Sequence, residues 1–373
     1  MRILNRSFLT HFCRMCFSFI MGCSFLGGNS HNAQAKSNQK TVEMAQQTNA
    51  TDPYANYKTF VPASEWLILS DSAKIPLHVW QAPSQRAIIF ALHGFNDSRD
   101  AWEYSAEYFV DEGISIYSPD QRGFGQAPLR GKWSSTDRMV QDVAEEVTII
   151  KNRFPNTPIY LMGESMGGAV LMCLAARDDA PQVNGYILLA PAVWGSKQIG
   201  VIGDVSLRLL NLIAPNWQLN PSKAPVKRVT ASDNNDSLIR LYFNPLTLHN
   251  TRVKALHGLV KLMDDAIRAA PRVRYHSLVL YGDNDQLVPS ASMYSVWEKF
   301  PKWVRKDYVP NGYHLLLRDQ NRKIVVKDII SWMNDPDRWL PSGGDAAAAA
   351  WMSVKGKGQV PFFMPSQVDN IVQ

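Results

Sequence analysis

The sequence predicts an α/β protein: a mostly parallel central sheet with helices on both faces and an inserted helical cap. Apolar runs of strand length alternate with helical patterns over most of the chain, which is typical of a parallel sheet covered on both faces. The alternation stops between residues 193 and 272, where helical patterns prevail. A chain of 373 residues with 46% apolar content can form one such domain with an insertion. We therefore expect a core of residues 59–192 and 273–340 and a cap of residues 193–272.

The expected core begins with an antiparallel hairpin over residues 65–81, where apolar and polar residues alternate around a polar turn. Strands of the parallel sheet are predicted at residues 87–92, 114–118, 158–162, 184–190, 276–281 and 305–309. Helices between them are predicted at residues 98–112, 135–153, 167–178, 290–299 and 321–333. Ligands of such sheets bind beyond the carboxyl ends of the strands, so functional residues are expected in the loops after them.

Within the cap, residues 205–213 carry apolar side chains on more sides than a helix with one wet face requires. One interpretation is a helix packed between the cap and the core. The other is a lid whose exposed apolar face receives an acyl chain or rests on a membrane. The neighbouring Trp194 and Trp217 favour the lid.

A nucleophile candidate lies where the strand predicted at residues 158–162 ends. Residues 163–167 read Gly-Glu-Ser-Met-Gly and lead into a small, apolar stretch that is suited to a buried helix. A strand that runs through Gly-x-Ser-x-Gly into a helix forms a sharp, strained turn that exposes the serine hydroxyl at the edge of the sheet. The alternative, a turn with a solvated hydroxyl, fits this context less well. Ser165 is therefore predicted to be a catalytic nucleophile.

A serine hydroxyl needs a base, and the base needs an orienting acid. In folds of this kind the three groups come in the chain order Ser, acid, His. Asp283 and Asp285 both follow the strand predicted at residues 276–281. We favour Asp285, because Asp283 directly after a glycine is equally suited to forming the turn. His314 is the expected base, since it follows the acid and comes just after an Asn-Gly pair at a strand end.

Two backbone N–H groups are expected to stabilise the oxyanion. One belongs to Met166, the residue after the nucleophile, and the other to the loop after the strand at residues 87–92, where Phe95 is the best candidate. His93 lies in the same loop but precedes the serine, so we expect it to brace the loop by hydrogen bonding. This chemistry requires no cofactor and no metal ion, and the sequence has no Cys/His spacing typical of a metal site.

Together these motifs resemble the α/β-hydrolases related to monoacylglycerol lipase and lysophospholipase, a serine aminopeptidase-like family. The resemblance covers roughly residues 60–335. The motifs that carry it are His93-Gly94-Phe95, Asp120-Gln121-Arg122-Gly123-Phe124-Gly125, Gly163-Glu164-Ser165-Met166-Gly167-Gly168, Gly282 to Asp285 with Leu287-Val288-Pro289, and Tyr313-His314.

This resemblance implies the α/β-hydrolase fold, a lid between Pro191 and Ala270, and a substrate with one long acyl chain, such as a monoacylglycerol or a lysophospholipid. One departure is Glu164, where the animal lipases usually carry histidine. In the family that side chain points away from the reacting atoms, which implies an effect on substrate preference rather than on the chemistry.

The expected reaction is ester hydrolysis through an acyl-enzyme. Rival functions on the same fold are a short-chain carboxylesterase, a thioesterase and a peptidase, whereas serine in place of aspartate at the turn disfavours a dehalogenase. A rival from another class is an inactive relative that serves as a surface binding protein. Intact candidates for all three catalytic roles argue against that rival.

The two ends of the chain have a different composition from the expected core. Residues 1–35 contain arginines, a short apolar run and Cys23 in a lipobox-like context, which predicts a signal peptide or a lipoprotein leader. The protein would then be exported to a bacterial periplasm, or anchored to a membrane through lipidated Cys23. Residues 36–58 are expected to be a linker, and residues 341–373 a low-complexity extension.

Charge and cysteine content exclude two other classes of protein, nucleic-acid-binding proteins and disulfide-rich proteins. The chain has 39 basic and 33 acidic residues without a Lys/Arg run, so we expect no nucleic-acid partner, while attraction to anionic lipid remains compatible with the net charge of +6. Three of the four cysteines lie in the leader, which leaves Cys173 as a small buried apolar residue and excludes a disulfide framework.

Overall fold

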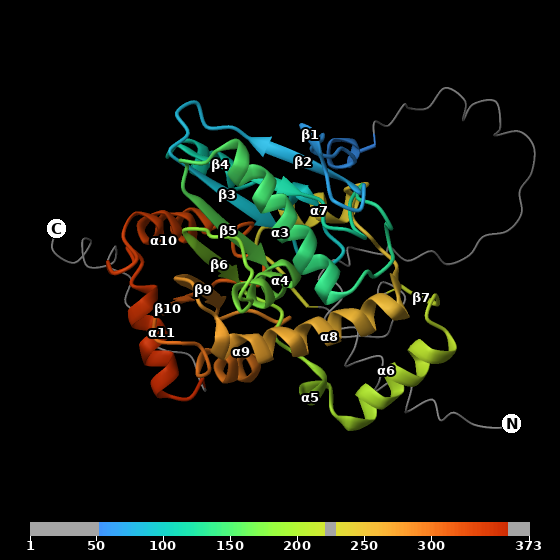
Figure 1. Cartoon of the computed structure of the whole chain (residues 1–373). Helices are drawn as coiled ribbons and strands as arrows, with labels where there is room; N and C mark the ends of the chain where they lie inside the picture. The colour runs from blue at the N-terminus through green and yellow to red at the C-terminus, as the bar shows by residue number, and fades with distance from the viewer. Residues whose placement is uncertain (1–51, 221–228, 357–373) are drawn as a thin grey trace, which may run out of the picture.

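An eight-stranded sheet forms the centre of the computed structural model, which describes residues 52–220 and 229–356 (Figure 1). The strand order is β1-β2-β4-β3-β5-β6-β9-β10. β2 pairs antiparallel with β1 and β4, and all other neighbours are parallel. The strands are β1 (Glu65–Ile68), β2 (Lys74–Trp80), β3 (Ala87–Leu92), β4 (Ile114–Pro119), β5 (Ile159–Glu164), β6 (Gly185–Leu189), β9 (Ser277–Gly282) and β10 (Val304–Val309). The predicted hairpin and the six predicted parallel strands are thus confirmed.

Helices cover both faces of the sheet, as predicted. β3 is buried at every position; its residues 88, 90 and 92 pack in one apolar cluster and residues 87, 89 and 91 in another. The helices of the core are η2 (Arg99–Trp102), α2 (Ala106–Val110), α3 (Thr136–Arg153), α4 (Met166–Ala175), α9 (Ser290–Trp297) and α10 (Arg322–Asn334). The first cluster includes α3, α4 and α9 together with α8 (Val253–Ala269), and the second includes α2 and α10.

The single helix predicted at residues 98–112 is wrong. The chain forms the 3-10 turn η2 and then the short helix α2. The side chains in the first turn bond to distant segments: Arg99 pairs with Asp120, and Asp100 pairs with Arg240 and accepts from the amide of Val61. These long-range contacts hold residues 99–102 in a 3-10 turn, which is tighter than the α-helix that the apolar pattern predicts.

The inserted cap is mainly helical, as predicted, and also contains a two-stranded ribbon. Its elements are α5 (Ser196–Ile199), α6 (Val201–Ile213), β7 (Gln218–Leu219), α7 (Asn235–Phe243), β8 (Thr251–Arg252), α8 (Val253–Ala269) and η4 (Ala270–Arg272). α8 packs on α4, and α6 packs on α5 and α8 at the lower right of the molecule (Figure 1). Of the residues of α6, only Leu207 is buried, so α6 is not a helix enclosed between the cap and the core.

Both expected tails include folded segments. The extension predicted from residue 341 is wrong up to residue 356, because α11 (Gly344–Ser353) packs on β10 and buries Trp351 to 1% exposure. The expected linker is wrong for residues 52–58: the 3-10 turn η1 (Ala55–Tyr57) contacts α7, and Tyr57 donates from its hydroxyl to Asp236. The leader over residues 1–35 with Cys23, residues 36–51 and residues 357–373 lie outside the described residues.

Candidate active site

The carboxyl ends of neighbouring parallel strands meet at one edge of the sheet. β3 pairs with β5 in the register Leu92↔Gly163, and β10 pairs with β9 in the register Val309↔Gly282. β6 lies between β5 and β9 and ends at the same level. The segments that follow the strands at this edge carry all the predicted site residues, namely Phe95, Ser165, Met166, Asp285 and His314.

Ser165 occupies a strained backbone turn between β5 and α4. Its φ of 52° lies in the left-handed region, which a side chain other than glycine adopts only under constraint. Added Cβ atoms explain the flanking glycines: one on Gly163 would lie 2.5 Å from the carbonyl carbon of Gly167, and one on Gly167 would lie 2.4 Å from the carbonyl oxygen of Leu92. The local chain path therefore has the strand-turn-helix form that the motif predicts.

His314 is paired with Asp285. The imidazole Nδ1–H donates to Asp285 Oδ2 over 2.8 Å, and His314 is only 2% exposed. The other carboxylate oxygen of Asp285 accepts from the amides of Leu287 and Val288, at 2.8 and 2.9 Å. Because the carboxylate fixes Nδ1 as the donor, Nε2 is the nitrogen that can accept a proton.

Asp283, the alternative acid, does not bond to His314. Its Oδ1 is buried and has no hydrogen-bond partner among the described residues. Burial raises the pKa of this carboxyl, and three backbone hydrogen bonds oppose the shift. The geometry therefore selects Asp285 as the partner of His314, a choice between two aspartates that the sequence leaves open.

The surroundings of His314 stabilise its charged form. Burial disfavours the imidazolium, but the charge and hydrogen bond of Asp285, with the charges of Glu164 and Asp319, outweigh it, so the pKa of His314 is raised. A base that must become positively charged during proton transfer benefits from such surroundings.

Two backbone donors are available beside the serine. Met166 is the first residue of α4, so its amide has no acceptor within the helix. The amide of Phe95 likewise has no acceptor within the described chain. Among the described residues, no hydrogen bond joins the hydroxyl of Ser165 to His314.

His93 braces the loop that contains Phe95, as predicted. It is fully buried; its Nδ1–H donates to the carbonyl of Gly94 over 2.7 Å, and its Nε2 accepts from the amide of Gln121 over 3.0 Å. Both ring nitrogens are thus engaged in structural bonds. Burial lowers the pKa of His93, which keeps the ring neutral.

Sequence reasoning missed an ion pair that joins the two loops of the site. Arg318 pairs with Asp97, and its Nε donates to the carbonyl of Ala101 over 3.2 Å. The pair links the segment after His314 to the loop after β3. No local motif predicts a contact between residues 221 positions apart.

Comparison with known proteins identifies the family to which this chain belongs. Residues 83–321 match the hydrolase family described as serine aminopeptidase, S33. The chain belongs to this family. Its resemblance to monoacylglycerol lipases is confirmed by two relatives and one solved structure.

Proteins similar to this chain include two lipases. The chain is 25% identical to monoglyceride lipase of Rattus norvegicus over 276 residues, which is 72% of this chain and 89% of the rat protein. It is 23% identical to monoacylglycerol lipase of Mycolicibacterium smegmatis over 267 residues, covering 70% and 92% of the two chains. The crystal structure of monoacylglycerol lipase from Paleococcus ferrophilus superposes with a TM-score of 0.58 at 20% identity, over 69% of this chain and 98% of that one. The α/β-hydrolase fold is thereby confirmed.

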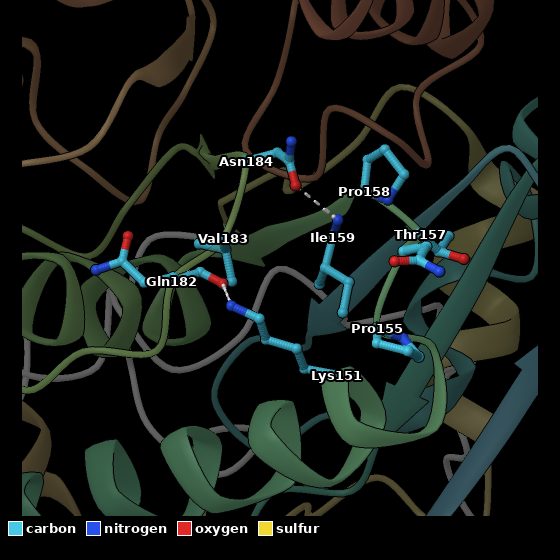
Figure 2. Close-up of a pocket in the computed structure, with 9 residues that line it drawn as sticks. Lys151, Pro155, Thr157, Pro158, Ile159, Gln182, Val183 and Asn184 are labelled. Atoms are coloured by element: carbon cyan, nitrogen blue, oxygen red, sulfur yellow. Dashed lines mark hydrogen bonds between the residues drawn. The ribbon is translucent and has the colours of Figure 1, made fainter.

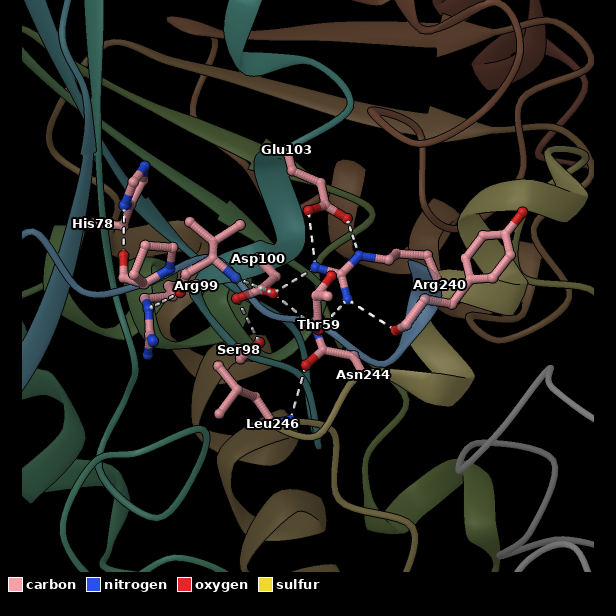
Figure 3. A network of polar contacts seen from close by, with 12 residues as sticks. Thr59, His78, Ser98, Arg99, Asp100, Glu103, Arg240, Asn244 and Leu246 are labelled. Atoms are coloured by element: carbon pink, nitrogen blue, oxygen red, sulfur yellow. Dashed lines mark hydrogen bonds and ion pairs between the residues drawn. The ribbon is translucent and has the colours of Figure 1, made fainter. Parts of the chain in front are cut away.

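In this hydrolase a buried polar network attaches the cap to the core (Figure 3). Arg240 of α7 forms two bonds to the carboxylate of Glu103, at 2.7 and 3.1 Å, and pairs with Asp100 over 3.0 Å. Asn244 also donates to Asp100 over 2.8 Å, and Arg240 donates to the carbonyl of Thr59. Burial raises the pKa of Asp100 to about 6, even though Arg240 opposes the shift. The network joins the N-terminal segment, the loop after β3 and the cap.

A separate hollow of about 300 Å³ lies at the opposite end of β5 (Figure 2). Its lining includes Ile159, the first residue of β5, together with Lys151, which donates to the carbonyl of Gln182, and Asn184, which accepts from the amide of Ile159. Ser165 follows the other end of β5, about 20 Å away at the usual rise per residue of a strand. The lining contains no serine or histidine, so this hollow is not part of the candidate active site.

Proposed function

We propose that this protein hydrolyses carboxylic esters through an acyl-enzyme on Ser165. The observation that carries the proposal is the 2.8 Å hydrogen bond between His314 and Asp285 at the sheet edge where the turn of Ser165 lies. A histidine oriented by a buried carboxylate next to a serine on such a turn is the arrangement that activates a hydroxyl. The names of the relatives support the same reaction class.

The proposed reaction proceeds in two halves. His314 Nε2 takes the proton of Ser165 Oγ as the oxygen attacks the ester carbonyl, and the amides of Phe95 and Met166 stabilise the oxyanion. The imidazolium then protonates the leaving alcohol, which leaves the acyl group on Ser165. A water molecule repeats the attack with His314 as base and releases the carboxylic acid. Asp285 stays ionised throughout and stabilises the imidazolium.

We propose a lipid with one long acyl chain as the substrate, in the manner of a monoacylglycerol or a lysophospholipid. The similar relatives are named for lipase activity on monoacylglycerols. The apolar surface of the cap supports a lipid substrate, because α6 exposes Ile202, Leu212 and Ile213 to 70%, 79% and 80%. Exposed apolar area of this kind is typical of an interaction surface.

Labelling with a fluorophosphonate tests the nucleophile. We expect the wild type to be labelled and Ser165→Ala to be unlabelled. Ser98→Ala, which changes a buried serine of the neighbouring loop, is the matched control and should retain labelling. Equal labelling of wild type and Ser165→Ala would refute the assignment.

A panel of esters with rising acyl length, together with thioester and peptide substrates, tests the substrate class. We expect kcat/KM to rise from acetyl to long acyl esters and to stay low for peptides. A preference for acetyl esters would favour a short-chain carboxylesterase, and a preference for thioesters or peptides would favour those rivals.

We also propose that the chain is exported and meets its substrate at a membrane, through lipidated Cys23 or through α6. No helix among residues 52–220 and 229–356 is long and apolar enough to cross a bilayer. Sedimentation with phosphatidylcholine vesicles should fall in a Leu212→Asp/Ile213→Asp variant, while hydrolysis of a soluble short ester should persist. Unchanged sedimentation would exclude α6 as the contact. Mass spectrometry of the mature N-terminus then distinguishes lipidated Cys23 from cleavage before Lys36.

A further inference from the structure

Glu164 is a buried acid whose carboxylate has no hydrogen-bond partner among the described residues. It is 0% exposed, and neither Oε1 nor Oε2 is bonded within the described chain. It directly precedes Ser165, and its Oε1 lies 3.5 Å from the position that a Cβ on Gly94 would occupy. A buried carboxyl without a donor is strongly disfavoured in its charged form, so this position between two loops of the site calls for an explanation.

The charged groups around Glu164 come from two other loops of the site. Arg318 and His314, which follow β10, favour its ionised form, whereas Asp97, which follows β3, and Asp319 oppose it. Arg318 is already paired with Asp97, and Asp319 accepts from Ser232 and from the amide of Tyr313. Burial is the largest effect and raises the pKa of Glu164 to about 7.

We propose that Glu164 controls how firmly His314 holds its proton, and thereby acts as a positioning residue in the proposed ester hydrolysis. Below neutral pH Glu164 is a neutral acid. Above neutral pH it becomes a second anion whose charge acts on the imidazole, in addition to that of Asp285. The anion stabilises the imidazolium that forms when Ser165 loses its proton. The inference rests on the proposed function and deepens it.

The proposal predicts that the pH profiles of wild type and Glu164→Gln diverge above neutral pH. In Glu164→Gln the side chain keeps its shape but cannot become charged. Well below neutral pH Glu164 is uncharged in the wild type as well, so the two profiles should coincide there. At pH 8 the imidazolium of the variant lacks a stabilising anion, so activity should fall roughly three- to tenfold. Simple structural damage would lower activity at every pH instead.

The experiment compares fluorophosphonate labelling rates of wild type, Glu164→Gln and Glu146→Gln from pH 5 to 9. Glu146 is the matched control, because it is another buried glutamate with a raised pKa, but its charged neighbours lie on α3 and at Arg122. We expect the profile of Glu164→Gln to coincide with wild type at acid pH and to fall below it above neutral pH, and the profile of Glu146→Gln to keep the wild-type shape throughout. Parallel, unshifted profiles for wild type and Glu164→Gln would overturn the inference. Absence of labelling in the wild type would instead refute the proposed function.

A second measurement does not depend on activity or on the folding of Glu164→Gln. Carboxyl ¹³C NMR of the Glu146→Gln protein should show one glutamate that titrates near pH 7, and His314→Gln in that background should raise its midpoint, because coupling between two sites is reciprocal. If every glutamate titrates below about pH 5.5, near the ordinary glutamate value, the inference fails.

Discussion

Trp351 of α11 stacks on Tyr308 of β10, with ring centroids 5.1 Å apart and 27° between the ring planes. Trp351 also packs edge-on against Trp297 at 5.1 Å and contacts Tyr281 at 5.7 Å. Tyr281 in turn donates from its hydroxyl to the carbonyl of Val288, in the loop that carries Asp285. The C-terminal helix thus supports the acid loop of the candidate active site.

Trp351→Ala should lower the free energy of unfolding by about 3–5 kcal/mol, because it leaves a cavity in this aromatic cluster. Urea unfolding followed by circular dichroism measures the change. Trp339→Ala is the control: Trp339 is 71% exposed, so its loss should change stability by less than about 1 kcal/mol. Similar losses for the two variants would show that α11 does not contribute as described.

Asp285→Asn should lower kcat about 10³–10⁴-fold on an activated ester, because a neutral amide neither stabilises the imidazolium nor holds the correct tautomer. Asp283→Asn should stay close to wild type, since Asp283 does not contact His314. Steady-state kinetics with both variants checks the assignment. A large loss for Asp283→Asn together with near-normal Asp285→Asn would reverse it.

Asp307→Asn should stabilise the protein above neutral pH. Asp307 is fully buried, neither carboxylate oxygen has a partner within the described part of the chain, and burial together with Asp328 and Asp345 raises its pKa well above the ordinary range. A folded-state pKa above the unfolded value means that the stability contributed by Asp307 is fully present below its unfolded pKa and is lost as pH rises through the folded pKa.

The expected gain for Asp307→Asn is about 1–3 kcal/mol at pH 8, with little or none at pH 4. Urea midpoints at the two pH values measure it. Asp337→Asn, a change at an exposed aspartate, should alter neither midpoint. A gain for Asp307→Asn that is equal at both pH values would mean that titration is not its cause.

Arg240→Met should destabilise the protein by about 3–5 kcal/mol at pH 8, because it leaves the buried carboxylate of Asp100 and the partly buried one of Glu103 beside an apolar chain. The loss should be smaller at pH 5, since the pKa of Asp100 is raised to about 6 and its carboxyl is then largely neutral. Arg208→Met, at an exposed i,i+4 pair with Asp204, should cost at most about 0.5 kcal/mol. Equal losses at both pH values would argue against ionised Asp100 as the cause.

The inner strands of the sheet could be predicted from the sequence because they are short, mainly apolar runs, as in Ala87–Leu92. The turn at Ser165 could be predicted because steric clashes restrict residues 163 and 167 to glycine. The choice between Asp285 and Asp283 required coordinates, since both follow the same strand and only the loop path brings one of them to His314.

Other features could not be predicted because the contacts that produce them involve residues that are distant in the sequence. The alanines of α11 look like low-complexity sequence, and only the partners of Trp351 show that the helix is folded onto the core. The helix predicted over residues 98–112 is broken by bonds to Asp120 and Arg240 that no local pattern reveals. The sequence shows Glu164 only as a variation in a motif, and only the packed structure shows that its carboxylate has no partner among the described residues.

The hydrogen bond from Arg240 to the carbonyl of Thr59 spans 181 residues, and this has a consequence for biosynthesis. A ribosome that adds about 5–20 residues per second needs roughly 10–40 s to make the intervening chain. During that interval Thr59, Asp100 and Glu103 have been synthesised, but Arg240, the cation that bonds to them, has not. Closure of the domain around them is therefore a late event, and the nascent chain must remain open until α7 has been translated.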